Sequence, residues 1–169
     1  QDARAAAHHA VVIVGAGPVG LSLAIDLAQR AIPCVLLDDA DRIGEGSRAI
    51  CFAKKTLEAF DRLGCAAPML EKGVRWSVGR VFQGEELLYR FDLLPEGGHK
   101  MPAFINLQQY HVEKDLVDRA GALPAVDLRW RNRVPRERLH PVEPFAPVDV
   151  RGFHITSFKW QHRDINLWK

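Results

Sequence analysis

Over the first forty residues, short runs of consecutive apolar residues alternate with a segment whose apolar residues recur every three or four positions. Residues 10–14 and 34–37 form continuous apolar runs, which are typical of parallel strands covered on both faces. Residues 18–30 lie between them and predict a helix, because one helical face carries Leu21, Ala24, Ile25 and Ala28. The order strand, helix, strand predicts a βαβ unit that opens an α/β fold.

The pattern changes after residue 73. Apolar and polar residues alternate around residues 74–78 and 87–93, with Gly84 between the two stretches. This period of two predicts an antiparallel hairpin over residues 74–93, with one buried face, inserted into the parallel fold. The remaining periodic stretches predict helices at 53–63 and 109–120, an extended piece at 104–106 and a strand at 125–130.

A glycine-rich turn joins the first predicted strand to the first predicted helix. Gly15, Gly17 and Gly20 have the G-x-G-x-x-G spacing of a dinucleotide-binding turn. We expect Gly15 to permit the tight turn, Gly17 to let a pyrophosphate approach the backbone, and Gly20 to let the helix pack close to the strand. Pro18 lies in the first helical turn, where its missing N–H costs nothing. The helix N-terminus would offer N–H groups to the phosphates.

Two acidic residues end the second predicted strand. Asp38 lies 18 residues after Gly20, close to the spacing at which an acid binds the ribose of a dinucleotide. A carboxylate there accepts hydrogen bonds from the ribose hydroxyls and repels a 2′-phosphate, which favours an adenosine without that phosphate, as in FAD or NAD. Asp39 is the weaker candidate of the pair, because neighbouring side chains of a strand point to opposite faces. The alternative is that both acids lie in a surface turn.

Composition narrows the class of protein. The chain has 169 residues and a net charge of +2, which argues against nucleic acid as its main partner. No apolar run approaches the roughly 18 residues of a membrane span. The three cysteines have no C-x-x-C spacing and indicate reduced thiols of a cytoplasmic protein. Residues 1–9 lack the apolar core of a signal peptide and are expected to form a flexible leader, and no metal site is expected at His8 and His9.

Four segments of the chain agree in order and spacing with one known group of enzymes. They are residues 11–20, residues 36–39, the run Gly-Ser-Arg-Ala-Ile-Cys-Phe-Ala at 46–53, and Phe-Ile-Asn-Leu-Gln-Gln at 104–109. Together they resemble the FAD-dependent aromatic hydroxylases, the group typified by p-hydroxybenzoate hydroxylase. The run at 46–53, followed by residues 60–64, looks most like the 3-(3-hydroxyphenyl)propionate hydroxylases. The resemblance covers about residues 10–133 and implies a Rossmann-like FAD-binding fold, with the hairpin opening a substrate-covering sheet.

The resemblance also implies roles for individual residues. The FAD pyrophosphate would lie against the three glycines of the turn, and Asp38 would bind the adenosine ribose. Arg48 matches the arginine that lies over the FAD phosphates, with a surface arginine as the alternative. Gln109 matches a glutamine that would hydrogen-bond the cofactor near its ribityl or phosphate portion, with an ordinary helix N-terminal residue as the alternative. Glu113, four residues further on, is expected to be a structural acid of the helix.

The activity implied by the resemblance belongs mainly to the cofactor. NAD(P)H would supply the electrons and O₂ the oxygen that is passed to an aromatic substrate, while the protein positions the ring and excludes water. Residues 1–133 contain no obvious acid–base or nucleophilic constellation, so no catalytic residue is assigned. The choice between NADH and NADPH and the oligomeric state stay open.

The resemblance to these hydroxylases ends near residue 134. It contains no Asp-Gly and no Gly-Asp dipeptide, although two later family motifs contain such pairs. Residues 129–169 hold nine Lys and Arg against four Asp and Glu, and four prolines fall within residues 135–148. These features predict a truncated or rearranged chain whose segment 134–169 is an atypical tail, with a basic nucleic-acid surface as the less favoured interpretation.

Three functions follow from these patterns. The first is the FAD-binding portion of a flavin-dependent monooxygenase, and the second is a non-catalytic FAD- or ADP-binding remnant. The third is an NAD-dependent dehydrogenase, for which Tyr110 and Lys114 stand at the i, i+4 spacing of a catalytic pair. The third is disfavoured by the residue 46–53 run, by the predicted hairpin and by the helix that Gln109 begins.

Overall fold

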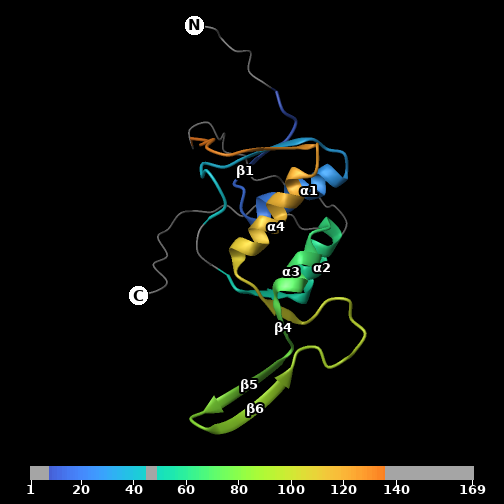
Figure 1. Cartoon of the computed structure of the whole chain (residues 1–169), viewed down its shortest axis with the longest axis vertical. Coiled ribbons are helices and arrows are strands. Elements are labelled where there is room, and N and C mark those ends of the chain that lie inside the picture. Colours follow the sequence, from blue (N-terminus) through green and yellow to red (C-terminus); the bar gives the residue numbers. More distant parts are fainter. Residues whose placement is uncertain (1–7, 45–48, 136–169) are drawn as a thin grey trace, which may run out of the picture. The chain divides into compact units, whose positions relative to one another are not determined.

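The computed structural model describes residues 8–44 and 49–135, and within these ranges it contains four helices and eight strands (Figure 1). The chain divides into two units, Gln1–Val134 and Pro135–Lys169, and every described helix and strand belongs to the first. Residues 136–169 of the predicted tail and residues 1–7 of the predicted leader lie outside the described residues.

A three-stranded parallel sheet forms the first layer. It consists of β1 (Val12–Val14), β2 (Cys34–Leu37) and β8 (Val126–Arg129), in the order β1-β2-β8. Helices α1 (Pro18–Gln29) and α4 (Gln109–Gly121) pack side by side against one face of this sheet (Figure 1). The buried contact consists of apolar side chains from the sheet, from α1 and from α4, namely Ile13, Leu36, Leu21, Ile25, Val112 and Leu116. The predicted βαβ unit is thereby confirmed.

A second, antiparallel sheet continues the fold. Its order is β3 (Cys51–Ala53), β7 (Phe104–Asn106) and β4 (Val74–Trp76), so the short extended piece predicted at 104–106 is the central strand. Helices α2 (Lys54–Leu63) and α3 (Ala66–Lys72) lie between β3 and β4 in the chain. Gly64 ends α2 with a left-handed φ of 79°, a conformation that glycine adopts without strain. No helix in the described part of the chain is long and apolar enough to cross a membrane.

The predicted hairpin begins later than the sequence indicates. It consists of β5 (Val78–Gln83) and β6 (Glu86–Asp92), whereas β4 pairs with β7 in the other sheet. The prediction of one continuous hairpin over residues 74–93 was wrong at its start, because alternation shows that a segment is extended but not which strand it pairs with. The turn has two residues, and Gly84 supplies the left-handed φ of 57° that the first of them requires.

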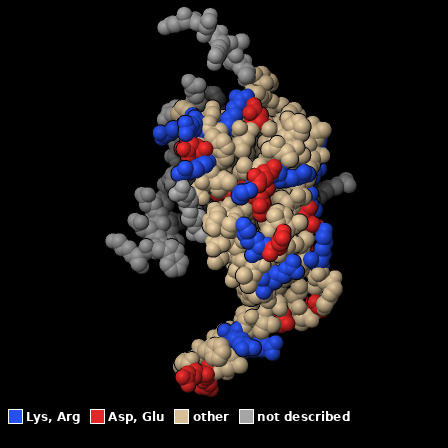
Figure 2. All heavy atoms as spheres, in the orientation of Figure 1, with Lys and Arg blue, Asp and Glu red and all other residues tan. Residues whose placement is uncertain are grey.

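The hairpin also lacks the buried face that its alternation predicts. Phe82, Leu87, Leu88 and Tyr89 are each about half exposed, and Figure 2 shows the hairpin surface as mostly uncharged atoms with acidic groups at its tip. Phe91 is the exception, because its ring covers Gly79 on the opposite strand, where a Cβ would lie 2.0 Å from the ring. A two-stranded ribbon of this kind gains little stability by itself.

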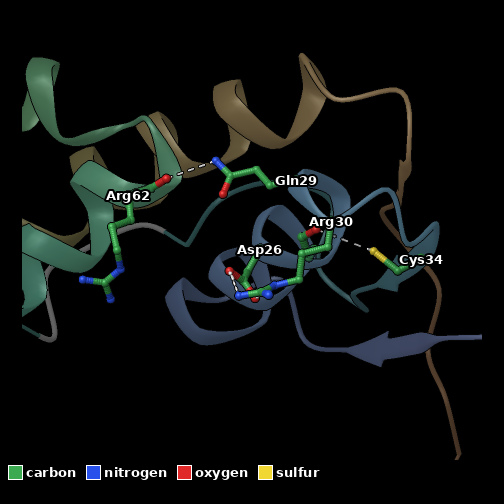
Figure 3. Close-up of polar contacts among 6 residues, drawn as sticks. Asp26, Gln29, Arg30, Cys34 and Arg62 are labelled. Atoms are coloured by element: carbon green, nitrogen blue, oxygen red, sulfur yellow. Dashed lines mark hydrogen bonds and ion pairs between the residues drawn. The ribbon is translucent and has the colours of Figure 1, made fainter.

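Polar contacts fasten the end of α1 to its neighbours (Figure 3). The side-chain amide of Gln29 donates to the carbonyl of Arg62 at 3.2 Å and to that of Leu63 at 3.0 Å, which satisfies carbonyls at the end of α2. Arg30 pairs with Asp26 one turn earlier on the exposed side of α1. These two bonds join the last residue of α1 to the C-terminal end of α2.

The packing of the parallel layer can be tested with two leucines. Leu36 is fully buried, whereas Leu88 of the hairpin is 52% exposed. We expect Leu36→Ala to lower the free energy of unfolding by about 2–5 kcal/mol, because it leaves a cavity in the core. Leu88→Ala is the matched control and is expected to change it by less than about 0.5 kcal/mol. Urea unfolding followed by far-UV circular dichroism makes the measurement, and equal losses would contradict the described core.

The cysteines allow a second test of the fold. Cys51 is exposed on β3, whereas Cys34 and Cys65 are buried, and burial raises the pKa of the Cys65 thiol to about 11. Since the thiolate is the reactive form, we expect one fast-reacting thiol at pH 8 with a disulfide reagent, and two that react only when the protein opens. Cys51→Ser should remove the fast phase, and Cys65→Ser should leave it unchanged. A fast phase that survives Cys51→Ser would contradict this arrangement.

Candidate functional site

The glycine turn lies between the end of β1 and the start of α1. Gly15 has a φ of 104°, which side-chain-bearing residues rarely adopt, and its N–H donates to the carbonyl of Leu37 at 2.7 Å. The turn is therefore held against the end of β2. This is the position that the sequence predicts for the turn of a dinucleotide site.

The other two glycines of the motif differ in what the protein itself requires. A Cβ on Gly20 would lie 2.0 Å from the carbonyl oxygen of Gly15, so no larger residue fits there without moving the backbone. A Cβ on Gly17 would meet nothing within 4 Å, and its φ of −76° is open to any residue. The fold thus explains the glycine at position 20, and it leaves open space at position 17 for a ligand.

The N-terminus of α1 opens toward the same space. Gly17 is its N-cap and provides no side-chain hydrogen bond, and Pro18 follows as the first helical residue. The first-turn N–H groups of a helix have no acceptor within the helix, and the helix dipole adds positive potential there. A diphosphate could accept from these groups, which is how such turns bind nucleotides.

Asp38 lies directly against the turn. Its Oδ2 accepts a hydrogen bond from the N–H of Ala16 at 2.6 Å, and its Oδ1 accepts from the N–H of Ala40 at 2.9 Å. The side chain is half-buried, whereas that of Asp39 is exposed. The structure therefore brings Asp38, and not Asp39, into contact with the glycine turn. That difference follows from the alternation of side chains along β2.

Gln109 is the first residue of α4 and lies beside the segment that follows Arg48. Its N–H donates to the carbonyl of Ala49 at 3.1 Å, and its side-chain amide donates to Glu113 Oε1 at 2.6 Å. Arg48 itself lies outside the described residues. The N–H of Leu107 donates to the carbonyl of Ile50 at 2.7 Å, so residues 49–50 and 107–109 are joined by two backbone hydrogen bonds.

The chain topology places these groups at one end of the parallel sheet. α1 leaves the carboxyl end of β1, and Asp38 follows the carboxyl end of β2. α4 ends at Gly121 and β8 begins at Val126, so a short connection holds the C-terminus of α4 near the amino end of the sheet. Because a helix joined in this way runs antiparallel to its strand, Gln109 points toward the carboxyl end as well. Ligands of open parallel sheets bind at that edge.

Sequence reasoning missed two contributors to this site. Ala16 is buried, and its backbone N–H is the group that Asp38 binds. A pattern of side chains does not predict which backbone N–H will donate, so only the structure could identify that of Ala16. Glu113 was expected to be a structural acid, and it is the partner of the Gln109 amide; their i, i+4 spacing on a predicted helix was the available signal.

Tyr110 and Lys114, the pair considered for a dehydrogenase, make their described contacts away from the glycine turn. Lys114 Nζ lies 2.5 Å from Asp118 Oδ2, and this ion pair raises the pKa of Lys114. The Tyr110 ring lies against His111, with ring centroids 4.1 Å apart. Neither residue contacts the glycine turn through any described hydrogen bond.

Among residues 8–44 and 49–135, no three His, Cys, Asp or Glu side chains gather as a metal site would need.

Comparison with known proteins agrees with this geometry. Residues 8–146 match the family of FAD binding domains. A flavin-dependent monooxygenase of Mycobacteroides abscessus is 36% identical over 117 residues, which are 64% of this chain and 25% of that protein. A 3-(3-hydroxy-phenyl)propionate/3-hydroxycinnamic acid hydroxylase of a Mycobacterium species is 27% identical over 73% of this chain and 22% of its own length.

A solved structure extends the agreement to three dimensions. The p-nitrophenol 4-monooxygenase of Pseudomonas putida superposes with a TM-score of 0.65 and 29% sequence identity, over 73% of this chain and 32% of that one. A turn of three glycines at the carboxyl end of a parallel sheet is the arrangement of a dinucleotide-binding fold. The chain belongs to the family of FAD binding domains, and its relatives include flavin-dependent monooxygenases and hydroxylases. It spans about a quarter to a third of the length of the relatives it matches.

The contrast between Gly17 and Gly20 predicts two different defects. Gly17→Ala meets no protein atom, so we expect the free energy of unfolding to change by less than about 1 kcal/mol. The added methyl group would enter the space for the pyrophosphate and weaken FAD binding at least tenfold, or by about 1.4 kcal/mol. Gly20→Ala should instead destabilise the fold by at least about 1–3 kcal/mol. Thermal unfolding and FAD titration separate the two, and normal FAD binding by Gly17→Ala would contradict the assignment.

Proposed function

We propose that the chain is the FAD-binding portion of a flavin-dependent monooxygenase that hydroxylates an aromatic acid or phenol with NAD(P)H and O₂. The observation that carries the proposal is the space at Gly17, between the N-terminus of α1 and Asp38. The fold requires no glycine at that position, whereas a bound pyrophosphate does. The family match gives the identity of the nucleotide as FAD.

The described residues fit the adenosine diphosphate half of FAD. The first-turn N–H groups of α1 would receive the pyrophosphate, and the free lone pairs of Asp38 would accept from the ribose hydroxyls. Arg48 would lie over the FAD phosphates, and Gln109 would hydrogen-bond the cofactor near its ribityl or phosphate portion. The contact between Gln109 and Ala49, the residue after Arg48, supports placing the two near each other. When bound, the flavin would supply the redox chemistry, and the chain's own residues would bind and orient it.

The hairpin is proposed to begin a substrate-covering layer. Its half-exposed apolar side chains support this role, because such surface is normally covered in a folded protein. Aromatic substrates are named for the matched relatives, one of which acts on nitrophenol. We further propose that the protein works in the cytoplasm, since Cys34, Cys51 and Cys65 are unpaired. The mixed charges on the face shown in Figure 2 favour a small-molecule partner over nucleic acid.

A second candidate is a nucleotide-binding module without turnover. One observation favours it: the glycine turn and Asp38 are suited to bind a nucleotide, and none of the described residues is assigned a catalytic role. In this form the glycine turn and Asp38 would bind FAD or ADP, while NAD(P)H oxidation would be absent. Adding a phenolic acid, NADH and FAD to the purified chain, and following absorbance at 340 nm, distinguishes the two candidates.

The proposed site predicts which half of FAD is recognised. We expect FAD to bind, ADP to compete with it, and FMN to compete at least tenfold less well, because the glycine turn and Asp38 would bind the adenosine diphosphate half, which FMN lacks. 2′-Phosphoadenosine 5′-diphosphate, which differs from ADP only in its 2′-phosphate, should also compete less well than ADP, since that phosphate would approach the carboxylates of Asp38 and Asp39. Quenching of flavin fluorescence measures the competition. Equal competition by FMN and ADP would contradict the proposed site.

A further inference from the structure

The carboxylate of Asp38 is engaged twice without any nucleotide. Oδ2 accepts from Ala16 at 2.6 Å, and Oδ1 accepts from Ala40 at 2.9 Å. Both are hydrogen bonds from neutral N–H donors to an ionised acceptor, the stronger class of such bonds. A residue that served only to bind ribose would not need the bond to Ala16.

The backbone around Asp38 is fixed as firmly as its side chain. Its N–H donates to the carbonyl of Arg129 at 3.1 Å, and its carbonyl accepts from Asn132 at 2.8 Å. The carbonyl of Ala40 accepts from Arg131 at 2.8 Å. These bonds tie the segment after β2 to the segment after β8, so the carboxylate projects from a rigid support.

The bond to Ala16 acts where the turn has the greatest freedom. Ala16 stands between two glycines, which have the largest choice of backbone conformations of any residue. Since the peptide bond is planar, fixing the N–H of Ala16 also fixes the carbonyl of Gly15. That carbonyl oxygen lies 2.0 Å from where a Cβ on Gly20 would stand, so the bond holds the turn at its point of close approach to α1.

We propose that Asp38 is a positioning residue that holds the glycine turn in its pyrophosphate-binding shape before the nucleotide arrives. This inference rests on the proposed function and adds to the ribose contact of Asp38. A carboxylate offers about four lone-pair positions, so two stay available for ribose hydroxyls after Ala16 and Ala40 are bound. The ordering entropy of the turn is then lost on folding and not on binding, which favours affinity.

The first test uses the nucleotide-free wild-type chain. Hydrogen exchange, followed by NMR, should show the Ala16 amide protected relative to that of Gly17 and comparable with that of Gly15, whose N–H is bound by Leu37. This measurement needs no variant and therefore does not depend on whether a variant folds. Exchange of Ala16 at the rate of an unstructured peptide would overturn the inference.

The second test uses Asp38→Asn, with Asp26→Asn on the exposed side of α1 as the matched control. An Asn side chain keeps the shape and retains one oxygen, which favours the local bond to Ala40, and it turns an NH₂ group toward Ala16. We expect Ala16 exchange to rise at least tenfold, and the affinities for pyrophosphate and for ADP both to fall at least about fivefold. Asp26→Asn should change none of these quantities.

The two ligands separate a positioning role from a ribose contact alone. Pyrophosphate has no ribose, so weaker pyrophosphate binding together with faster Ala16 exchange supports the inference. Weaker ADP binding with unchanged pyrophosphate binding and unchanged Ala16 exchange would overturn it. Failure of the wild-type chain to bind FAD or ADP would instead overturn the proposed function. The exchange of the Ala16 amide would still report on its hydrogen bond to Asp38.

Discussion

The close approach of α1 to the end of β1 is the constraint on which the rest of the structure depends. A Cβ on Gly20 would lie 2.0 Å from the carbonyl oxygen of Gly15, so the helix can begin where it does only because that atom is absent. The approach buries Leu21 and Ile25 against the sheet and directs the first turn of α1 toward the open space at Gly17. The same contact therefore serves core packing and the nucleotide site.

The parallel layer and the hairpin differ in how far they bury their apolar side chains. Where α1 and α4 pack on the sheet, side chains such as Leu116 and Leu36 are at 0% exposure, whereas Val12 and Val14 of β1 are about half exposed. The hairpin instead leaves apolar side chains such as Tyr89, at 57%, exposed. The matched segment makes up only 25% and 22% of the length of two relatives, so those proteins contain further chain that can cover such a surface. The nucleotide site belongs to the well-packed part.

Much of the fold could be predicted from the sequence, since its signals are local. The apolar runs and the helical stripes predicted the βαβ unit and three helices that the structure confirms. Helix α3 was not predicted, because its seven residues are too few for a clear periodicity and include Pro68. The start of the hairpin was wrong, because Val74 belongs to a strand whose partner, β7, comes about thirty residues later.

By itself, the sequence determined that a strand, a glycine turn and a helix follow one another, since backbone freedom and side-chain period act over a few residues. It also determined that an acid ends β2. Only the tertiary structure decided that Asp38 binds the N–H of Ala16, 22 residues away, and that Gln109 meets Ala49. The physical reason is that both contacts use backbone groups, which every residue carries and which no pattern of side chains distinguishes. Their partners are chosen by the packing of distant elements.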